Sequence, residues 1–125
     1  MFNIRIKVKG YLENLTENTK EIINTQALKK SNVISYIIDN NKYKIIIDNK
    51  KITQCRESDE YSHVMFFEET KKHTTEYYLK GSNYSLEFTI LTTKLIIEKN
   101  KIHKTYKIIE SENIYNYVLE MSENL

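Results

Sequence analysis

The sequence has no proline, no tryptophan, two glycines and one cysteine. So little proline and glycine excludes collagen-like and proline-rich segments, and two separate glycines cannot build a phosphate-binding glycine-rich loop. A single cysteine excludes an intramolecular disulfide. The longest apolar run is Val64–Phe67, which is too short for a membrane-spanning helix or a secretion signal. We therefore expect a protein of the reducing cytoplasm that does not associate with membranes.

The chain is of a size and composition typical of one folded domain. It has 125 residues, of which 40% are hydrophobic and 29% charged, and its net charge is only +2. A disordered chain would be less apolar and more highly charged, so residues 1–125 are predicted to form a single domain. Residues 1–56 carry a net charge of +6 and the remainder −4. Lysines on one strand can pair with glutamates on the next, so we do not expect a nucleic-acid-binding face.

Apolar residues alternate with polar ones along most of the chain, as in half-buried strands. Ile4, Ile6 and Val8 show the pattern at the start. It predicts further strands at 33–38, 42–47, 52–56, 61–68, 72–79, 84–91, 95–99, 102–109 and 114–121, separated by turn-forming residues. Residues 11–18 are predicted as a polar turn region, and residues 20–30 fit a helix or a strand, with a slight preference for the strand. The predicted fold is all-β, a single antiparallel up-and-down barrel of about 8–10 strands with little helix.

Short motifs in a characteristic order add a resemblance to a known family. They are the segments 6–10, 64–68, 75–77, 86–88 and 92–95, together with Arg56, Gly81 and the strand around Tyr106. In order and spacing, these motifs resemble the YwiB-like family of small bacterial proteins of unknown function. The resemblance implies a lipocalin-like (calycin) antiparallel barrel and brings no established activity.

The sequence is poor in the groups that catalysis and metal binding need. Pairing along the hairpin after residue 61 predicts that His63 faces Tyr77 and that His73 faces Phe67, so no two histidines meet. Cys55 has no cysteine partner, and neighbouring strand residues such as Cys55 and Arg56 point to opposite faces. We therefore expect no metal site, no cofactor and no catalytic residues, and the sequence favours a binding function over an enzyme.

An inward-facing arginine makes ligand binding the leading hypothesis. Arg56 has the same parity as Ile52 and therefore points into the barrel if Ile52 does. A buried guanidinium must be paired, and a ligand carboxylate or phosphate can supply the partner. We predict a ligand-binding site formed by Arg56, His63, Tyr77 and Tyr106, for a small anionic or amphipathic molecule inside the barrel.

Two alternatives remain open. The same residues could form a closed polar network that rigidifies a filled barrel, with no ligand. The protein could also act through its outer surface or an edge strand, with a protein partner or as a homodimer, because the strand 114–121 carries apolar residues on both faces.

Overall fold

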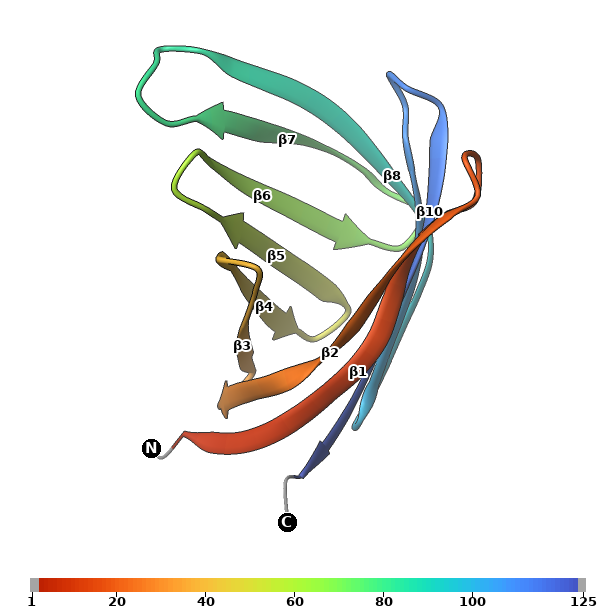
Figure 1. Ribbon diagram of the computed structural model, residues 1–125. Helices are drawn as coiled ribbons and strands as arrows, with labels where there is room; N and C mark the ends of the chain where they lie inside the picture. Colours follow the sequence, from red (N-terminus) through yellow and green to blue (C-terminus); the bar gives the residue numbers. More distant parts are fainter. Residues whose placement is uncertain (1–2, 124–125) are drawn as a thin grey trace.

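The computed structural model describes residues 3–123, which form ten antiparallel strands and no helix. The strands are β1 (Ile4–Asn14), β2 (Thr19–Lys30), β3 (Val33–Ile38), β4 (Asn41–Asp48), β5 (Lys51–Glu57), β6 (Tyr61–Glu68), β7 (Lys72–Leu79), β8 (Ser85–Glu98), β9 (Lys101–Ile108) and β10 (Asn113–Glu123). Each strand pairs with its neighbour in sequence, and β1 pairs with β10, so the sheet closes on itself (Figure 1). The predicted all-β up-and-down barrel is confirmed.

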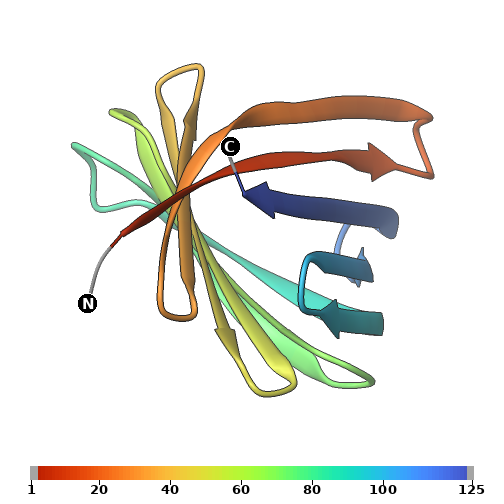
Figure 2. The same ribbon diagram turned by 90° about the horizontal axis from the view of Figure 1, so that it is seen from below.

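Tight turns connect the strands, and their residues suit the backbone that such turns require. Positive φ angles are cheap for asparagine, aspartate and glycine. Five of the eight residues at positive φ in the described structure are of these types, namely Asn18, Asp39, Asn40, Asn49 and Gly81. Short turns and strict neighbour pairing wind the chain into a strongly coiled sheet, which is seen along another direction in Figure 2.

The interior of the barrel is filled by side chains from alternate strand positions. The largest fully buried side chains are Val8, Ile34, Ile45, Ile52, Phe67, Ile90, Thr92, Ile102, Lys104 and Leu119. Burying aliphatic and aromatic side chains of this size contributes about 1.5–3 kcal/mol each. Lys104 is the one member of this set whose side chain can carry a charge.

The structure confirms the preferred strand at residues 20–30, which lie within β2, and corrects two other details of the predicted strands. The polar region after residue 10 continues β1 as far as Asn14. The segments 84–91 and 95–99 form one continuous strand, β8, which contains a bulge between Thr92 and Lys94. A bulge inserts one unpaired residue and lets a strand bend without ending, so the polar residues there are not a turn.

The predicted pairing along the β6–β7 hairpin is correct for His63 and wrong for His73. His63 faces Tyr77, but the ladder between these strands ends at Val64 and Glu76. Beyond that point His73 pairs with Ile90 on β8 instead of Phe67 on β6. The two strands separate there because the turn between them hydrogen-bonds to β8: the amide of Thr70 donates to the carbonyl of Thr92.

One end of the barrel contains most of the predicted site residues. It is formed by the turns β1–β2, β3–β4, β5–β6, β7–β8 and β9–β10, and we call it the mouth. The start of β1 and the end of β10 lie at the opposite end. Within residues 3–123, no helix is long and apolar enough to cross a membrane.

Candidate functional site

A row of polar aromatic residues and one arginine lines the inside of the barrel near the mouth. Its members are consecutive cross-strand partners on β2 to β7: Ala27, Tyr36, Tyr43, Arg56, His63 and Tyr77. We call this set the inner row. Tyr36 identifies the inward face, because its hydroxyl lies 3.1 Å from the hydroxyl of Tyr117 on the opposite wall. The structure therefore brings three of the predicted site residues, Arg56, His63 and Tyr77, side by side.

The Arg56 guanidinium lies between two tyrosine rings. Its central carbon is 5.5 Å from the ring centroid of Tyr43 and 5.2 Å from that of Tyr61. Cation–π contacts of this kind stabilise a guanidinium by about 0.5–2 kcal/mol, more when water is excluded. The two rings hold the guanidinium in place, and a hydrogen bond from Arg56 to the Tyr61 side chain adds to this contact. Arg56 Nε is buried and has no partner among the described residues.

No carboxylate neutralises Arg56 within residues 3–123. The ion pairs there join Lys71 and His73 to Glu68, and Lys80 to Glu57. Glu57 follows Arg56 in the chain but points to the other face of the strand, where it lies 3.2 Å from Lys80. Burial removes part of the hydration of the guanidinium, and an anion is one group that can replace it. Glu21 is a negative charge on the same inner face: after burial and against Arg56, it adds to the raised pKa of Tyr43 and of Tyr61.

His63 is the cross-strand neighbour of Arg56 and is neutral at pH 7. Its ring makes edge contacts with Tyr77 and Phe88, at centroid distances of 5.4 and 6.1 Å. Burial and the positive charge of Arg56 lower the pKa of His63 from 6.5 to about 4. His63 Nε2 is buried and has no hydrogen-bond partner in the described structure. The site thus contains a second unused polar atom beside the arginine.

The tyrosines around Arg56 are uncharged and well anchored. Burial raises the pKa of Tyr43 and of Tyr61, although Arg56 opposes the shift. Tyr61 donates its hydroxyl proton to Asn41 Oδ1 at 2.8 Å and stacks on Tyr77 at 4.9 Å. Tyr36 stacks on Tyr43 at the same distance, 4.9 Å. These contacts fix the walls of the site before any ligand arrives.

Tyr106, the fourth predicted site residue, lies in a different cluster deeper in the barrel. It makes an edge contact with Phe67 and stacks on Tyr115, at centroid distances of 4.9 and 5.2 Å. Its side chain is almost completely buried, and burial raises its pKa. No contact joins it to Arg56, His63 or Tyr77 among the interactions of the described residues.

The deeper cluster surrounds Lys104, which the sequence analysis did not single out. Lys104 is 1% exposed and donates from Nζ to Gln54 Oε1. Its Nζ lies 3.4 Å from the ring centroid of Phe67 and 4.5 Å from that of Tyr117. Burial lowers the pKa of Lys104 well below 10.5. A signal was present in the sequence, because Lys104 has the parity of the buried Ile102.

A small cavity opens at the mouth on the wall opposite Arg56. Its volume is about 340 Å³, and it is lined by Leu12, Asn14, Thr19, Lys20, Glu21 and Tyr115. Glu21 is placed on the inner face by its pairing with Leu12. A cavity of this size lies at the lower end of the range for small-molecule sites.

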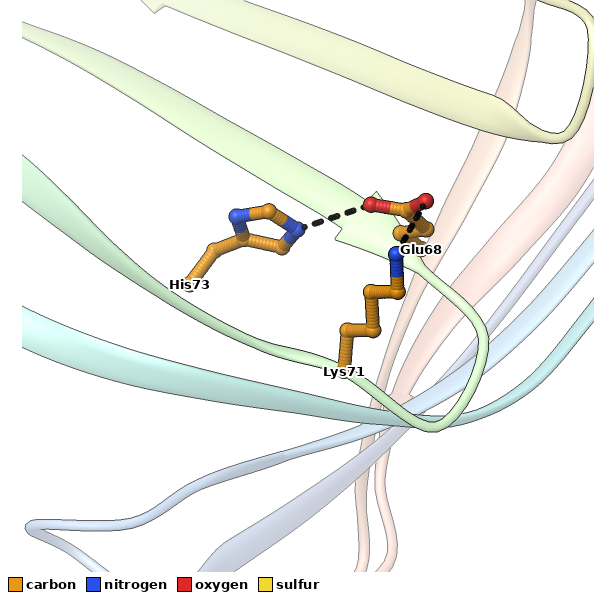
Figure 3. Close-up of polar contacts among 3 residues, drawn as sticks. All are labelled: Glu68, Lys71 and His73. Carbon is orange, nitrogen blue, oxygen red and sulfur yellow. Dashed lines mark hydrogen bonds and ion pairs between the residues drawn. The ribbon is translucent and has the colours of Figure 1, made fainter.

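The remaining histidines and the cysteine lie apart from this site. His73 Nε2 is 3.3 Å from Glu68 Oε1, and Lys71 Nζ is 3.1 Å from Glu68 Oε2 (Figure 3). His103 Nε2 lies 2.6 Å from Asn116 Oδ1. Cys55 faces outward, away from the inner row. Among residues 3–123, no three histidine, cysteine, aspartate or glutamate side chains are grouped so that they could hold a metal ion.

Comparison with known proteins agrees with the fold. No family model and no curated protein matches the sequence. Among solved structures, the YwiB protein of Bacillus subtilis is similar, with a TM-score of 0.66 and 17% sequence identity over 98% of this chain and 92% of that one. The resemblance inferred from the sequence motifs is therefore confirmed at the level of fold, and the chain is similar to YwiB as a β-barrel.

Proposed function

We propose that the protein is a non-enzymatic binding module that holds a small anion at the mouth of the barrel. The observation that carries the proposal is Arg56, a half-buried guanidinium fixed between Tyr43 and Tyr61, with a buried Nε that has no partner in the described structure. A carboxylate or phosphate group would accept from the guanidinium fork and supply the missing counter-charge.

The surroundings of Arg56 favour an anion with a flat or apolar body. The rings of Tyr61 and Tyr77 already stack at 4.9 Å, and aromatic ligands pack well against such faces. In the neutral His63 tautomer that carries its hydrogen on Nε2, this nitrogen can donate one further hydrogen bond to the anion. The site combines one charge-assisted anchor with a mainly apolar wall, as small-molecule sites commonly do.

The two alternatives fare differently against the geometry. A closed polar network does not account for Arg56 and His63, since each leaves a buried nitrogen without a partner. An interaction protein that uses an edge strand finds no free edge in the closed sheet of the described residues. The strand 114–121 is partly covered on its outer face, where Val118 is buried. A homodimer or protein partner would therefore have to use the outer surface.

A panel of flat carboxylates, each paired with its neutral amide, tests the proposal. We expect at least one carboxylate, such as naphthoate, to raise the melting temperature, while naphthamide has little effect. In isothermal titration, Arg56→Gln should weaken binding by about 10–100-fold, the usual value of a hydrogen bond to a charged group. Lys94→Gln is the matched control, because it removes a positive charge from an exposed position on β8 that lines neither cavity.

The result that would overturn the proposal is defined by the same variants. Arg56→Lys keeps the charge but not the two-pronged donor, so it should bind with intermediate affinity. Far-UV circular dichroism establishes that each variant is folded. If no carboxylate stabilises the wild-type protein, or if Lys94→Gln and Arg56→Gln weaken binding equally, the mouth is not an anion site.

A further inference from the structure

A second cavity lies on the outside of the barrel. It is a groove of about 870 Å³ that crosses β2 to β6. Three consecutive residues of each of these strands line it, and the middle one always belongs to the inner row: Ala27, Tyr36, Tyr43, Arg56 and His63. These middle side chains point into the barrel, so the groove floor beneath them is main chain. The groove is therefore separate from the mouth, on the opposite face of the same wall.

Two rows of outward-facing side chains form the walls of the groove. The first row comprises Arg5, Leu28, Ser35, Lys44, Cys55 and Val64, which are consecutive cross-strand partners. The second comprises Gln26, Ile37, Lys42, Glu57 and Ser62. Small side chains at Ser35, Cys55 and Ser62 leave depth between the larger ones. Neighbouring strands lie about 4.8 Å apart, so a groove that reaches from Arg5 on β1 to Val64 on β6 is about 24 Å long.

The groove exposes an unusual amount of apolar side chain. Leu28, Ile37 and Val64 are 46%, 60% and 37% exposed. They lie on three different strands and face the same elongated hollow. Contiguous exposed apolar surface in a hollow marks a binding site more often than scattered exposed residues do.

The charges that border the groove are mostly positive. Arg5, Lys42 and Lys44 line it, against a single carboxylate, Glu57. Glu57 is already engaged by Lys80 at 3.2 Å. The free charge along the groove is therefore positive, and it selects for an anionic group.

We propose that this groove is a second binding site, for a linear amphipathic anion such as an aliphatic carboxylate. The chain of the ligand would run from β4 across β3 to β2 and cover Ile37 and Leu28, and its head group would lie against Lys42 and Lys44, beside Cys55. Burying a chain contributes about 0.8 kcal/mol per methylene group, which an exposed groove realises only in part. The proposal does not depend on the anion site at the mouth, because the two sets of side chains point to opposite faces of the sheet.

The only cysteine of the chain reports directly on occupancy. Cys55 lies in the groove between Lys44 and Val64, its cross-strand neighbours. N-ethylmaleimide is uncharged, so its reaction rate with Cys55, followed by mass spectrometry, reflects access more than electrostatic steering. We expect dodecanoate, used below its micellar concentration, to slow the reaction at least about fivefold at saturation, and methyl dodecanoate to have a much smaller effect.

Charge-reversal variants locate the head group. Lys44→Glu should raise the dodecanoate concentration that gives half-maximal protection by about tenfold. The matched control Lys94→Glu, at an exposed lysine on β8 outside the groove, should leave that concentration unchanged. Arg56→Gln should also preserve the ratio of rates with and without dodecanoate. Lys44→Gln, with a smaller expected loss, serves as the second variant should Lys44→Glu fail to fold.

Several outcomes would overturn the proposal. If dodecanoate leaves the rate of N-ethylmaleimide reaction with Cys55 unchanged, the groove does not bind aliphatic carboxylates. Equal losses in Lys44→Glu and Lys94→Glu would show non-specific attraction. Loss of protection in Arg56→Gln but not in Lys44→Glu would place the anion in the mouth. A dimer in light scattering that itself protects Cys55 would show that a second copy of the chain covers the groove.

Discussion

Replacing Lys104 with methionine should stabilise the protein at neutral pH. Lys104 is buried among Phe67, Tyr106 and Tyr117, and its only hydrogen-bond acceptor in the described structure is Gln54. Burial penalises the ammonium form and lowers the pKa of Lys104. The aromatic rings oppose this shift, but each contributes about 2 kcal/mol at most, whereas the effective cost of burying a charge is several kcal/mol. We therefore expect the folded protein to hold this lysine neutral.

A lysine that is neutral when folded and charged when unfolded makes stability depend on pH. Its pKa is lowered by folding, so the unfolded chain binds one more proton below pH 10.5, the ordinary pKa of lysine. Stability then rises with pH by about 1.4 kcal/mol per unit for as long as this difference lasts. The slope extends from pH 10.5 down to the lowered pKa of the folded state, below which it disappears. Lys104→Met removes this contribution to the slope and the cost of deprotonating the lysine.

Lys104→Met has its own cost, which is smaller. Methionine has a similar length and no polar atom, but Gln54 loses its donor, at about 1–3 kcal/mol. Replacing a buried charged group by an apolar one of similar size stabilises proteins by up to about 1–4 kcal/mol. The variant should therefore be more stable than the wild-type protein at pH 7 by an amount in this range, and its advantage should shrink as the pH rises toward 10.5. Gln54→Leu combined with Lys104→Met removes the unpaired acceptor and should increase the gain.

Urea unfolding at pH 7, 8 and 9 measures these differences. The chain has no tryptophan but ten tyrosines, so tyrosine fluorescence and far-UV circular dichroism are suitable signals. The quantity of interest is the difference between the pH slopes of wild-type and Lys104→Met stability. Parallel slopes would refute the reasoning, because they would mean that Lys104 keeps its proton in the folded core and that the aromatic rings suffice to hold an ammonium ion.

Two further predictions concern the closure of the barrel and its behaviour in acid. Gly10→Ala should destabilise the protein by about 3 kcal/mol or more in urea unfolding, because the added Cβ would lie 1.8 Å from the main-chain oxygen of Val118 on β10. Gly81 has a φ of +80° and open space around it, so Gly81→Ala should cost only about 1–2 kcal/mol. Equal losses of stability in Gly10→Ala and Gly81→Ala would contradict the argument from the clash at Gly10. Burial lowers the pKa of His63 from 6.5 to about 4 in the folded protein. Between these pH values the unfolded chain binds a proton that the folded protein does not, so the free energy of unfolding decreases as the pH is lowered. Allowing for solvent screening at the half-exposed ring, this loss of stability is about 1–2 kcal/mol. His63→Phe should abolish the loss. If the stability of His63→Phe still falls by the same amount between pH 6.5 and pH 4, other groups are responsible.

The alternation of apolar and polar residues alone predicted much of the barrel, because successive residues of a strand point alternately inward and outward. It also placed Arg56 on the inner face and His63 opposite Tyr77, as observed. It could not show that Tyr106 lies in a different layer of the barrel. Parity identifies the face on which a residue lies, but its depth depends on the stagger of the strands, which pairing in three dimensions determines.

Other features were out of reach for different physical reasons. Lys104 has core parity, yet lysine is almost never fully buried, so composition argued against the position it occupies. The outer groove depends on how the sheet coils across β2 to β6, and a hydrophobicity pattern carries no information about coiling. The role of Arg56, His63, Tyr77 and Tyr106 in ligand binding stays a prediction.

Closure by β1 and β10 also shapes how the protein folds. Nine of the ten strand pairs join neighbours in sequence, while the tenth brings Gly10 opposite Leu119. Hairpins form locally within microseconds, but joining the two ends of a long chain carries a larger entropic cost. The amides along this seam are therefore expected to acquire protection from hydrogen exchange late in folding and to be among the first to lose it when the barrel opens.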